Sequence, residues 1–279
     1  MKKSYELDMC NGPILGKILG FAIPLMISGI LQLLFNAADI IVVGRFTGSQ
    51  ALAAVGSTSA LINLIINLFI GVSVGANVVV ARNYGAKDYD GIHGAVHTSV
   101  LTAIWGGIIL IFVGILLARP MLEMMGTPED VINLSVLYMR IYFVGMPAFM
   151  MYNFGAAILR AIGDTKRPLY FLTLSGVVNV VLNLFFVIVF HMGVAGVALA
   201  TIISQAISAF LIILCLMKMD GPCHLDFKHL KFHPEQLKSM LRIGLPAGLQ
   251  GAIFSISNVL IQSSVNSFGA VAMAGNTAS

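Results

Sequence analysis

Charged residues are scarce in this sequence, and they avoid its long apolar runs. Asp, Glu, Lys and Arg make up only 10% of the 279 residues, whereas hydrophobic residues make up 58% and the mean hydropathy is +0.94. A soluble domain needs more polar side chains than this to cover its surface. The composition therefore excludes a soluble globule and predicts a multi-span membrane protein.

Cysteine is nearly absent as well. Three cysteines, Cys10, Cys215 and Cys223, are too few and too far apart for a disulfide framework, and no two have Cys-x-x-Cys spacing. The start of the chain has no short apolar stretch that ends in a cleavage site, so we expect no removable signal peptide.

The patterns that accompany enzymatic chemistry are also missing. The sequence has no phosphate-binding glycine loop, no paired carboxylates and no nucleophile with a matching base in a plausible site. His93 and His97 form one histidine pair, and a second group follows in the segment 223–233, but neither has a complete zinc-ligand pattern. We therefore expect no enzyme, no bound metal and no cofactor.

Long apolar runs are what the sequence has in abundance. About 20 apolar residues cross a bilayer as a helix, and open sheet edges cannot face lipid. The sequence therefore predicts an all-α polytopic helix bundle. Seven runs are long enough, at residues 14–43, 52–80, 93–118, 131–158, 168–191, 194–217 and 239–267.

The basic residues are distributed unevenly among the turns between these runs. With a cytoplasmic amino terminus, only Arg45 and Arg119 fall outside, and Arg140 lies within the fourth span. The other thirteen lie inside: Lys2, Lys3, Lys17, Arg82, Lys87, Arg160, Lys166, Arg167, Lys218, Lys228, Lys231, Lys238 and Arg242. The positive-inside rule then predicts a multi-pass protein of the plasma membrane with its amino terminus in the cytoplasm. This charge has a topological explanation, so we expect no nucleic-acid partner.

The segment 218–238 is the one long polar stretch and predicts a cytoplasmic linker. The sequence on its two sides is loosely repeated, because Leu245-Pro246 opens the last span as Ile23-Pro24 opens the first. Such repeats are typical of secondary transporters, whose binding sites lie between the halves. We therefore predict a six-helix lobe at 1–217, the linker at 218–238 and the start of a second lobe at 239–279.

Four of the spans carry a polar stripe along one helix face. At 100° per residue, each of the following sets falls on one side of its helix: Ser28, Gln32, Asn36 and Asp39; Ser59, Asn63, Asn67, Ser73 and Asn77; Ser175, Asn179 and Asn183; Thr201, Ser204, Gln205 and Ser208. A single stripe can be explained by hydrogen bonds between helices. Four stripes together favour a polar cavity.

Asp39 is the only carboxylate within the predicted spans. A charged side chain at the centre of a membrane helix costs about 2.5–3.5 kcal/mol on insertion scales, so such a residue indicates an ion or substrate site. Two alternatives stay open: the carboxylate can reach toward the outer interface, or it can pair with Arg140.

Proline and glycine mark further positions within the spans. Pro24, Pro147 and Pro246 each remove a helical hydrogen bond, so we expect kinks there. Three Gly-x-x-x-Gly motifs, at 16–20, 71–75 and 244–248, allow close helix approach, although the chain has 28 glycines and the signal is weak.

Several of these motifs resemble the multidrug and toxic compound extrusion (MATE) family. The similar segments are Ile23-Pro24, then Asp39-Ile-Ile-Val-Val-Gly44, then Leu52-Ala-Ala-Val-Gly56, then Arg160-Ala-Ile-Gly-Asp-Thr-Lys-Arg-Pro168, and Asn179 with Asn183. The resemblance implies two six-helix lobes around a central cavity and export of cationic amphiphilic compounds in exchange for H⁺ or Na⁺. It also implies that Asp39, Asn179 and Asn183 couple the ion.

The sequence departs from the family in two ways. Some members have an aspartate where Asn183 stands, and some have a glutamate near Phe254. Without these carboxylates, Asp39 alone would carry the ion exchange. The family's usual twelve helices also need a longer chain, so the resemblance suggests a fragment or a truncated protein.

The candidate substrate cavity follows from the stripes and the repeat. The expected partners are a small cationic amphiphile and the lipid bilayer, with no obligate protein partner. Two other functions stay open: a flippase for lipid-linked precursors, and an inactive membrane remnant. A flippase cavity should need basic residues to bind pyrophosphate, and Arg140 is the only basic residue within the predicted spans, which counts against this function. The predicted cavity residues are Ser28, Gln32, Asn36, Asn63, Asn67, Gln205, Gln250 and Asn258.

Overall fold

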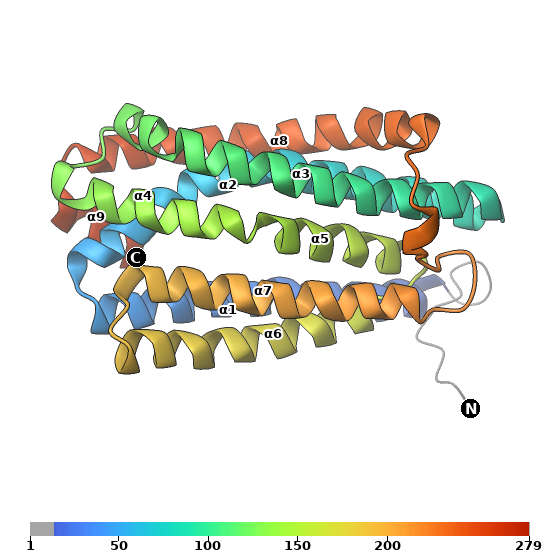
Figure 1. Cartoon of the computed structure of the whole chain (residues 1–279), viewed down its shortest axis with the longest axis horizontal. Helices are drawn as coiled ribbons and strands as arrows, with labels where there is room; N and C mark the ends of the chain where they lie inside the picture. Colours follow the sequence, from blue (N-terminus) through green and yellow to red (C-terminus); the bar gives the residue numbers. More distant parts are fainter. Residues whose placement is uncertain (1–13, 279) are drawn as a thin grey trace.

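The computed structural model describes residues 14–278, and these form a bundle of helices (Figure 1). Six helices are long and apolar enough to cross a membrane, or seven if α4 and α5 count as one broken span. The predicted all-α bundle is confirmed for the described residues. Cys10, Lys2 and Lys3, which entered the sequence predictions, lie outside them. The α-helices are α1 Ile14–Phe46, α2 Ser49–Gly85, α3 Tyr89–Met124, α4 Glu129–Val144, α5 Met146–Ala161, α6 Lys166–Leu184, α7 Gly193–Met217, α8 Pro234–Asn266 and α9 Ala270–Ala278.

The turns between the helices gather at the two ends of the bundle. The turns after α2 and α5 and the linker after α7 lie at one end (right in Figure 1), and those after α1, α3, α6 and α8 lie at the other. Because neighbouring spans alternate in direction, α1 and α5 run in opposite directions. Asp39 is seven residues before the end of α1, and Arg160 is one residue before the end of α5, so they stand toward opposite ends of the bundle.

The predicted fourth span is broken. α4 and α5 meet at Gly145 with a bend of 48°, next to Pro147. Proline cannot donate the backbone hydrogen bond that would continue the helix. The expected kink therefore occurs near Pro147, whereas α1 continues through Pro24 and α8 through Pro246.

A tight turn joins α5 to α6. The side chain of Asp164 is buried and accepts hydrogen bonds from the backbone N–H groups of Lys166 (3.2 Å) and Arg167 (3.1 Å). Its other carboxylate oxygen lies 3.1 Å from Nε of Arg167. Gly163 supplies the left-handed conformation of the turn at φ 85°. These contacts satisfy the exposed N–H groups at the start of α6.

The buried core lies between α2, α3, α4, α5 and α7, where large side chains such as Phe143, Phe154 and Leu110 have no accessible surface or almost none. The outer faces of α1 and α6 expose Leu33 and Val181, among other apolar side chains. An apolar outer surface suits lipid contact.

α2 and α8 share the most extensive contact of any helix pair in the described chain. Glycines on both helices bring the two backbones together. A Cβ atom added to Gly71 would lie 2.2 Å from the backbone nitrogen of Gly248, and one added to Gly244 would lie 2.5 Å from the Cα atom of Val72. Two of the three weak Gly-x-x-x-Gly motifs thus meet each other at this crossing.

The linker folds back onto the start of α3. His97 is fully buried there, and its Nε2 atom lies 3.2 Å from the backbone carbonyl oxygen of Asp226. The backbone N–H of His233 donates a hydrogen bond to Thr98 Oγ1 at 3.1 Å. The predicted linker is therefore packed against the bundle, and it contains the short 3₁₀ helix η2, Phe227–His229.

Candidate functional site

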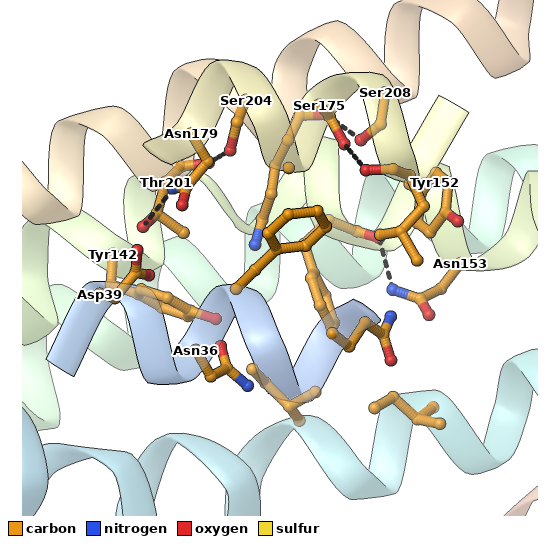
Figure 2. Close-up of a pocket in the computed structure, with 18 of the residues that line it drawn as sticks. Asn36, Asp39, Tyr142, Tyr152, Asn153, Ser175, Asn179, Thr201, Ser204 and Ser208 are labelled. Atoms are coloured by element: carbon orange, nitrogen blue, oxygen red, sulfur yellow. Dashed lines mark hydrogen bonds between the residues drawn. The ribbon is translucent and has the colours of Figure 1, made fainter. Parts of the chain in front are cut away.

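A cavity of about 450 Å³ opens between α1, α2, α4, α5, α6 and α7 (Figure 2). Its wall is mostly polar and includes several aromatic rings. The residues that line it are Gln32, Phe35, Asn36, Asp39, Asn63, Ile66, Ile70, Tyr142, Phe149, Tyr152, Asn153, Arg160, Leu172, Ser175, Gly176, Asn179, Thr201, Ser204, Gln205 and Ser208.

A hydrogen-bond network joins Asp39 on α1 to α6 and α7. The side-chain amide of Asn183 donates a hydrogen bond to Asp39 Oδ1 and lies 3.3 Å from Asn179 Oδ1, to which it also donates. Asn179 in turn donates to Thr201 Oγ1 at 3.4 Å. The spacing of Asn179 and Asn183, one turn apart, puts both amides on the face of α6 that meets α1 and α7.

This network contains an oxygen atom with no partner. Oδ1 of Asn183 is buried and accepts no hydrogen bond in the described structure. A buried polar atom without a partner is costly, so its presence calls for an explanation, and a contact with a bound ion or ligand is one. The carboxylate and amide oxygens together form the kind of oxygen-rich site that a hard cation prefers, and the carboxylate can also accept a proton.

The alternative partner of Asp39 does not reach it. Arg140 lies on an exposed face of α4, and no ion pair between it and Asp39 occurs among the described residues. Asp39 itself faces the cavity. The structure thus favours an ion or substrate role for Asp39 over pairing with Arg140.

The structure distributes the predicted site residues over several places. Six of them line the cavity: Asp39, Asn179, Gln32, Asn36, Asn63 and Gln205. Asn183 does not line it but donates a hydrogen bond to Asp39. Each of the four predicted stripes therefore contributes at least one residue to the cavity wall, although the stripe on α2 contributes only Asn63. Within each stripe, the residues that line the cavity are spaced so that they fall on one face of their helix.

The other four predicted cavity residues lie elsewhere. Ser28 donates to the backbone carbonyl of Pro24 (2.8 Å), one turn earlier on α1, as serine side chains within helices commonly do. Asn67 donates to Ser255 on α8 (2.7 Å). Gln250 and Asn258 are exposed on α8, which packs against α2 and does not contribute to the cavity wall.

Four functional candidates on α4 and α5 were missed by the sequence analysis: Tyr142, Tyr152, Asn153 and Arg160. The sequence analysis placed Arg160 in a cytoplasmic turn, where basic residues are expected. It therefore counted Arg140 as the sole basic residue within the spans when it weighed a flippase for lipid-linked precursors. The structure adds Arg160 to the cavity wall. A signal existed, because Asn153 and Arg160 are seven residues apart and so share a helix face.

The comparisons with known proteins agree with this architecture. The family model MatE matches residues 24–185. The probable multidrug resistance protein YoeA of Bacillus subtilis (strain 168) is 33% identical over 261 residues, which cover 91% of this chain and 56% of the relative. The chain thus spans little more than half the length of this relative.

Solved transporter structures have the same fold. An inward-facing conformation of a multidrug resistance MATE family transporter of the MOP superfamily aligns with a TM-score of 0.83 at 28% identity, covering 92% of this chain and 60% of that one. An outward-facing conformation of such a transporter aligns with a TM-score of 0.81 at 30% identity, covering 87% of this chain and 54% of that one.

Proposed function

Because this chain belongs to the MatE family of multi-pass membrane transporters, we propose that it acts in secondary active transport and exports cationic amphiphilic compounds in exchange for H⁺ or Na⁺. The observation that carries this proposal is Asp39, a carboxylate that lines a polar cavity within the helix bundle and has no cationic partner in the described chain. An ionisable group in such a place is a natural cation site.

The coupling follows from the competition for Asp39. A proton or Na⁺ neutralises the carboxylate, and the positive group of a substrate does the same, so the two do not fully occupy the site together. If each binds one arrangement of the helices better than the other, their exchange drives alternating access. Asn179, Asn183 and Thr201 support this role because they hold oxygen atoms and hydrogen-bond donors beside the carboxylate.

The composition of the cavity wall supports the proposal that the substrate is amphiphilic. Phe35, Tyr142 and Phe149 offer aromatic surface, while Asn36 and Gln205 offer hydrogen-bonding groups. Sites for small organic molecules combine apolar walls with a few polar groups in this way. The charge distribution of the sequence further supports an orientation with the amino terminus and the linker on the cytoplasmic side.

Transport by membrane vesicles tests the coupling role. The measurement compares efflux of a fluorescent cationic dye, driven by an imposed proton or sodium gradient, for the wild type and Asp39→Asn. We expect gradient-driven efflux by the wild type and none by Asp39→Asn at equal amounts of membrane-inserted protein. Undiminished efflux by Asp39→Asn contradicts the proposal.

Thermal unfolding in detergent distinguishes the two ions. A ligand that binds only the folded protein raises its melting temperature. If Na⁺ binds, NaCl raises the melting temperature of the wild type relative to choline chloride at the same ionic strength, and Asp39→Asn removes the difference. If the ion is H⁺, the two salts give equal melting temperatures. A Na⁺ effect that persists in Asp39→Asn places the ion elsewhere.

A further inference from the structure

Arg160 is the one cationic side chain in the cavity wall described above. Of the twenty residues that line the cavity, only Asp39 and Arg160 carry a formal charge. They come from α1 and α5, which run in opposite directions, and they stand toward opposite ends of the bundle (Figure 1). The cavity therefore has a negative group toward one end and a positive group toward the other.

Among residues 14–278, no acidic side chain neutralises the guanidinium of Arg160. Its Nε atom is buried and has no hydrogen-bond partner, and no carboxylate of the described chain forms an ion pair with it. The nearby carboxylate of Asp164 contacts Arg167 instead. The Tyr152 hydroxyl donates a hydrogen bond to the backbone carbonyl of Pro168 at 3.1 Å, and no hydrogen bond joins its oxygen to Arg160 in the described structure.

A buried charge without a partner is unfavourable, and a bound anion removes this cost. Guanidinium is suited to the task because its planar N–H groups match the two oxygens of a carboxylate. Tyr152 and Asn153 also line the cavity (Figure 2), and they precede Arg160 by about two turns on α5.

We propose that Arg160 forms a subsite for a single anionic group, such as a carboxylate, so that the cavity accepts zwitterionic amphiphiles whose cationic group lies toward Asp39 and whose anionic group lies on Arg160. This inference rests on the proposed function only in taking the cavity as the substrate site. It narrows the substrate class from cations in general to molecules that also carry an acceptor for Arg160.

Two dyes that differ by one ester group provide the test. Rhodamine 19 has a free carboxylate and is a zwitterion at neutral pH, whereas rhodamine 6G is its ethyl ester and is a cation. Their dissociation constants are measured by fluorescence polarisation on protein in detergent or nanodiscs, without an ion gradient. The variants are Arg160→Gln and a matched control, Arg140→Gln, which removes the same charge from an exposed position outside the cavity.

The quantity that decides is the preference for the acid over the ester, expressed as the ratio of the two dissociation constants. A charge-assisted hydrogen bond of this kind corresponds to roughly a tenfold effect or more. We expect the preference to fall at least tenfold in Arg160→Gln and to stay unchanged in Arg140→Gln. An unchanged preference in Arg160→Gln, an equal loss of both dyes, or no binding of rhodamine 19 to the wild type overturns the proposal.

A competition experiment covers the case in which Arg160→Gln does not fold. Benzoate, added to the wild type, should displace rhodamine 19 and leave rhodamine 6G bound; displacement of both dyes or of neither overturns the proposal. Because binding is measured without a gradient, the two proposals fail separately. If the wild type binds rhodamine 19 with the expected preference but shows no ion-driven efflux, only the transport proposal is contradicted. If it shows ion-driven efflux but no preference for rhodamine 19 that depends on Arg160, only the Arg160 subsite is contradicted.

Discussion

The side-chain amide of Asn183 on α6 donates a hydrogen bond to the carboxylate of Asp39 on α1. The partner that accompanies the carboxylate is therefore an uncharged amide. Its carbonyl oxygen is buried and free to accept a further contact. An amide at this place positions Asp39 without neutralising it, so the carboxylate keeps its negative charge available to a proton, a metal ion or a substrate.

Replacing Asn183 by alanine should therefore destabilise the contact between α1 and α6. Side-chain hydrogen bonds between membrane helices contribute about 0.6–2 kcal/mol. We expect Asn183→Ala to lower the free energy of unfolding by an amount in this range, measured by thermal or denaturant unfolding in detergent. Asn258→Ala is the control because Asn258 is exposed on α8. Equal stability changes in the two variants would contradict the structural role of Asn183.

Because α2 and α8 cross so closely, adding a single methyl group at their contact should destabilise the protein. Gly71→Ala would put its Cβ atom 2.2 Å from the backbone nitrogen of Gly248, so one helix must move. Overpacking of this kind costs about 1–3 kcal/mol. Gly29→Ala on α1 is the matched control, since its Cβ atom would meet nothing within 4 Å. The comparison is made by unfolding in detergent, and a Gly71→Ala protein as stable as Gly29→Ala would argue against this packing.

Asn67 and Ser255 provide a second measure of the same helix pair. Their side chains form a 2.7 Å hydrogen bond between α2 and α8. A double-mutant cycle with Asn67→Ala and Ser255→Ala should give a coupling energy of about 0.6 kcal/mol and at most about 1.7 kcal/mol. Pairing Asn67→Ala with Ser257→Ala, an exposed position on α8, should give none. Equal coupling in both cycles would show that the effect does not come from this bond.

The turn between α5 and α6 should depend on the acceptor oxygens of Asp164. Asp164→Ala leaves the backbone N–H groups of Lys166 and Arg167 without their acceptor in a buried place and should cost about 1–3 kcal/mol. Asp164→Asn keeps one acceptor oxygen and should cost less. Unfolding in detergent checks the order of stability, which is wild type, then Asn, then Ala. Indistinguishable Asn and Ala variants would show that charge matters here and hydrogen bonding does not.

The linker should respond to acid through Asp226. Hydrogen bonds from the backbone N–H of Lys228 and from the His229 side chain lower the pKa of Asp226 below its ordinary value. Because the pKa of Asp226 is lower in the folded chain than in the unfolded chain, its ionised carboxylate stabilises the linker above the unfolded-chain pKa of about 4. This stabilisation is lost as the pH falls through the pKa of the folded chain. Amide hydrogen exchange at Lys228, corrected for its intrinsic pH dependence, should show falling protection below about pH 4. Asp226→Asn should flatten this change, and an unaltered pH profile would rule out Asp226 as its cause.

Much of the fold and part of the site follow from sequence periodicity alone. The apolar runs predict the helices because each must hide its own backbone polar groups in lipid. The positions of Asp39, Asn179 and Gln205 follow from helical spacing, which puts the members of a stripe on one face. The break beside Pro147 follows from the missing N–H of proline.

What the sequence could not predict depends on which helices are neighbours. The spacing of Asn67 places it on a polar face but does not reveal that Ser255 lies opposite. The repeat that starts at Pro24 and Pro246 placed Gln250 and Asn258 among the predicted cavity residues, yet α8 packs on α2 and both side chains are exposed. Arg160 looks like an ordinary basic residue at a helix end, and only the arrangement of the six surrounding helices brings it into the cavity wall.

The glycine crossing also supplies a fixed reference for measurements of motion. Because the backbones of α2 and α8 touch at Gly71 and Gly248, there is no side-chain layer between them that could rearrange. Spectroscopic labels on the two helices near this point should report one unchanging separation. A change in the distance between labels on α8 and labels on α6 or α7 would then report rearrangement of the helices that form the cavity. The constant distance between labels on α2 and α8 serves as the internal reference.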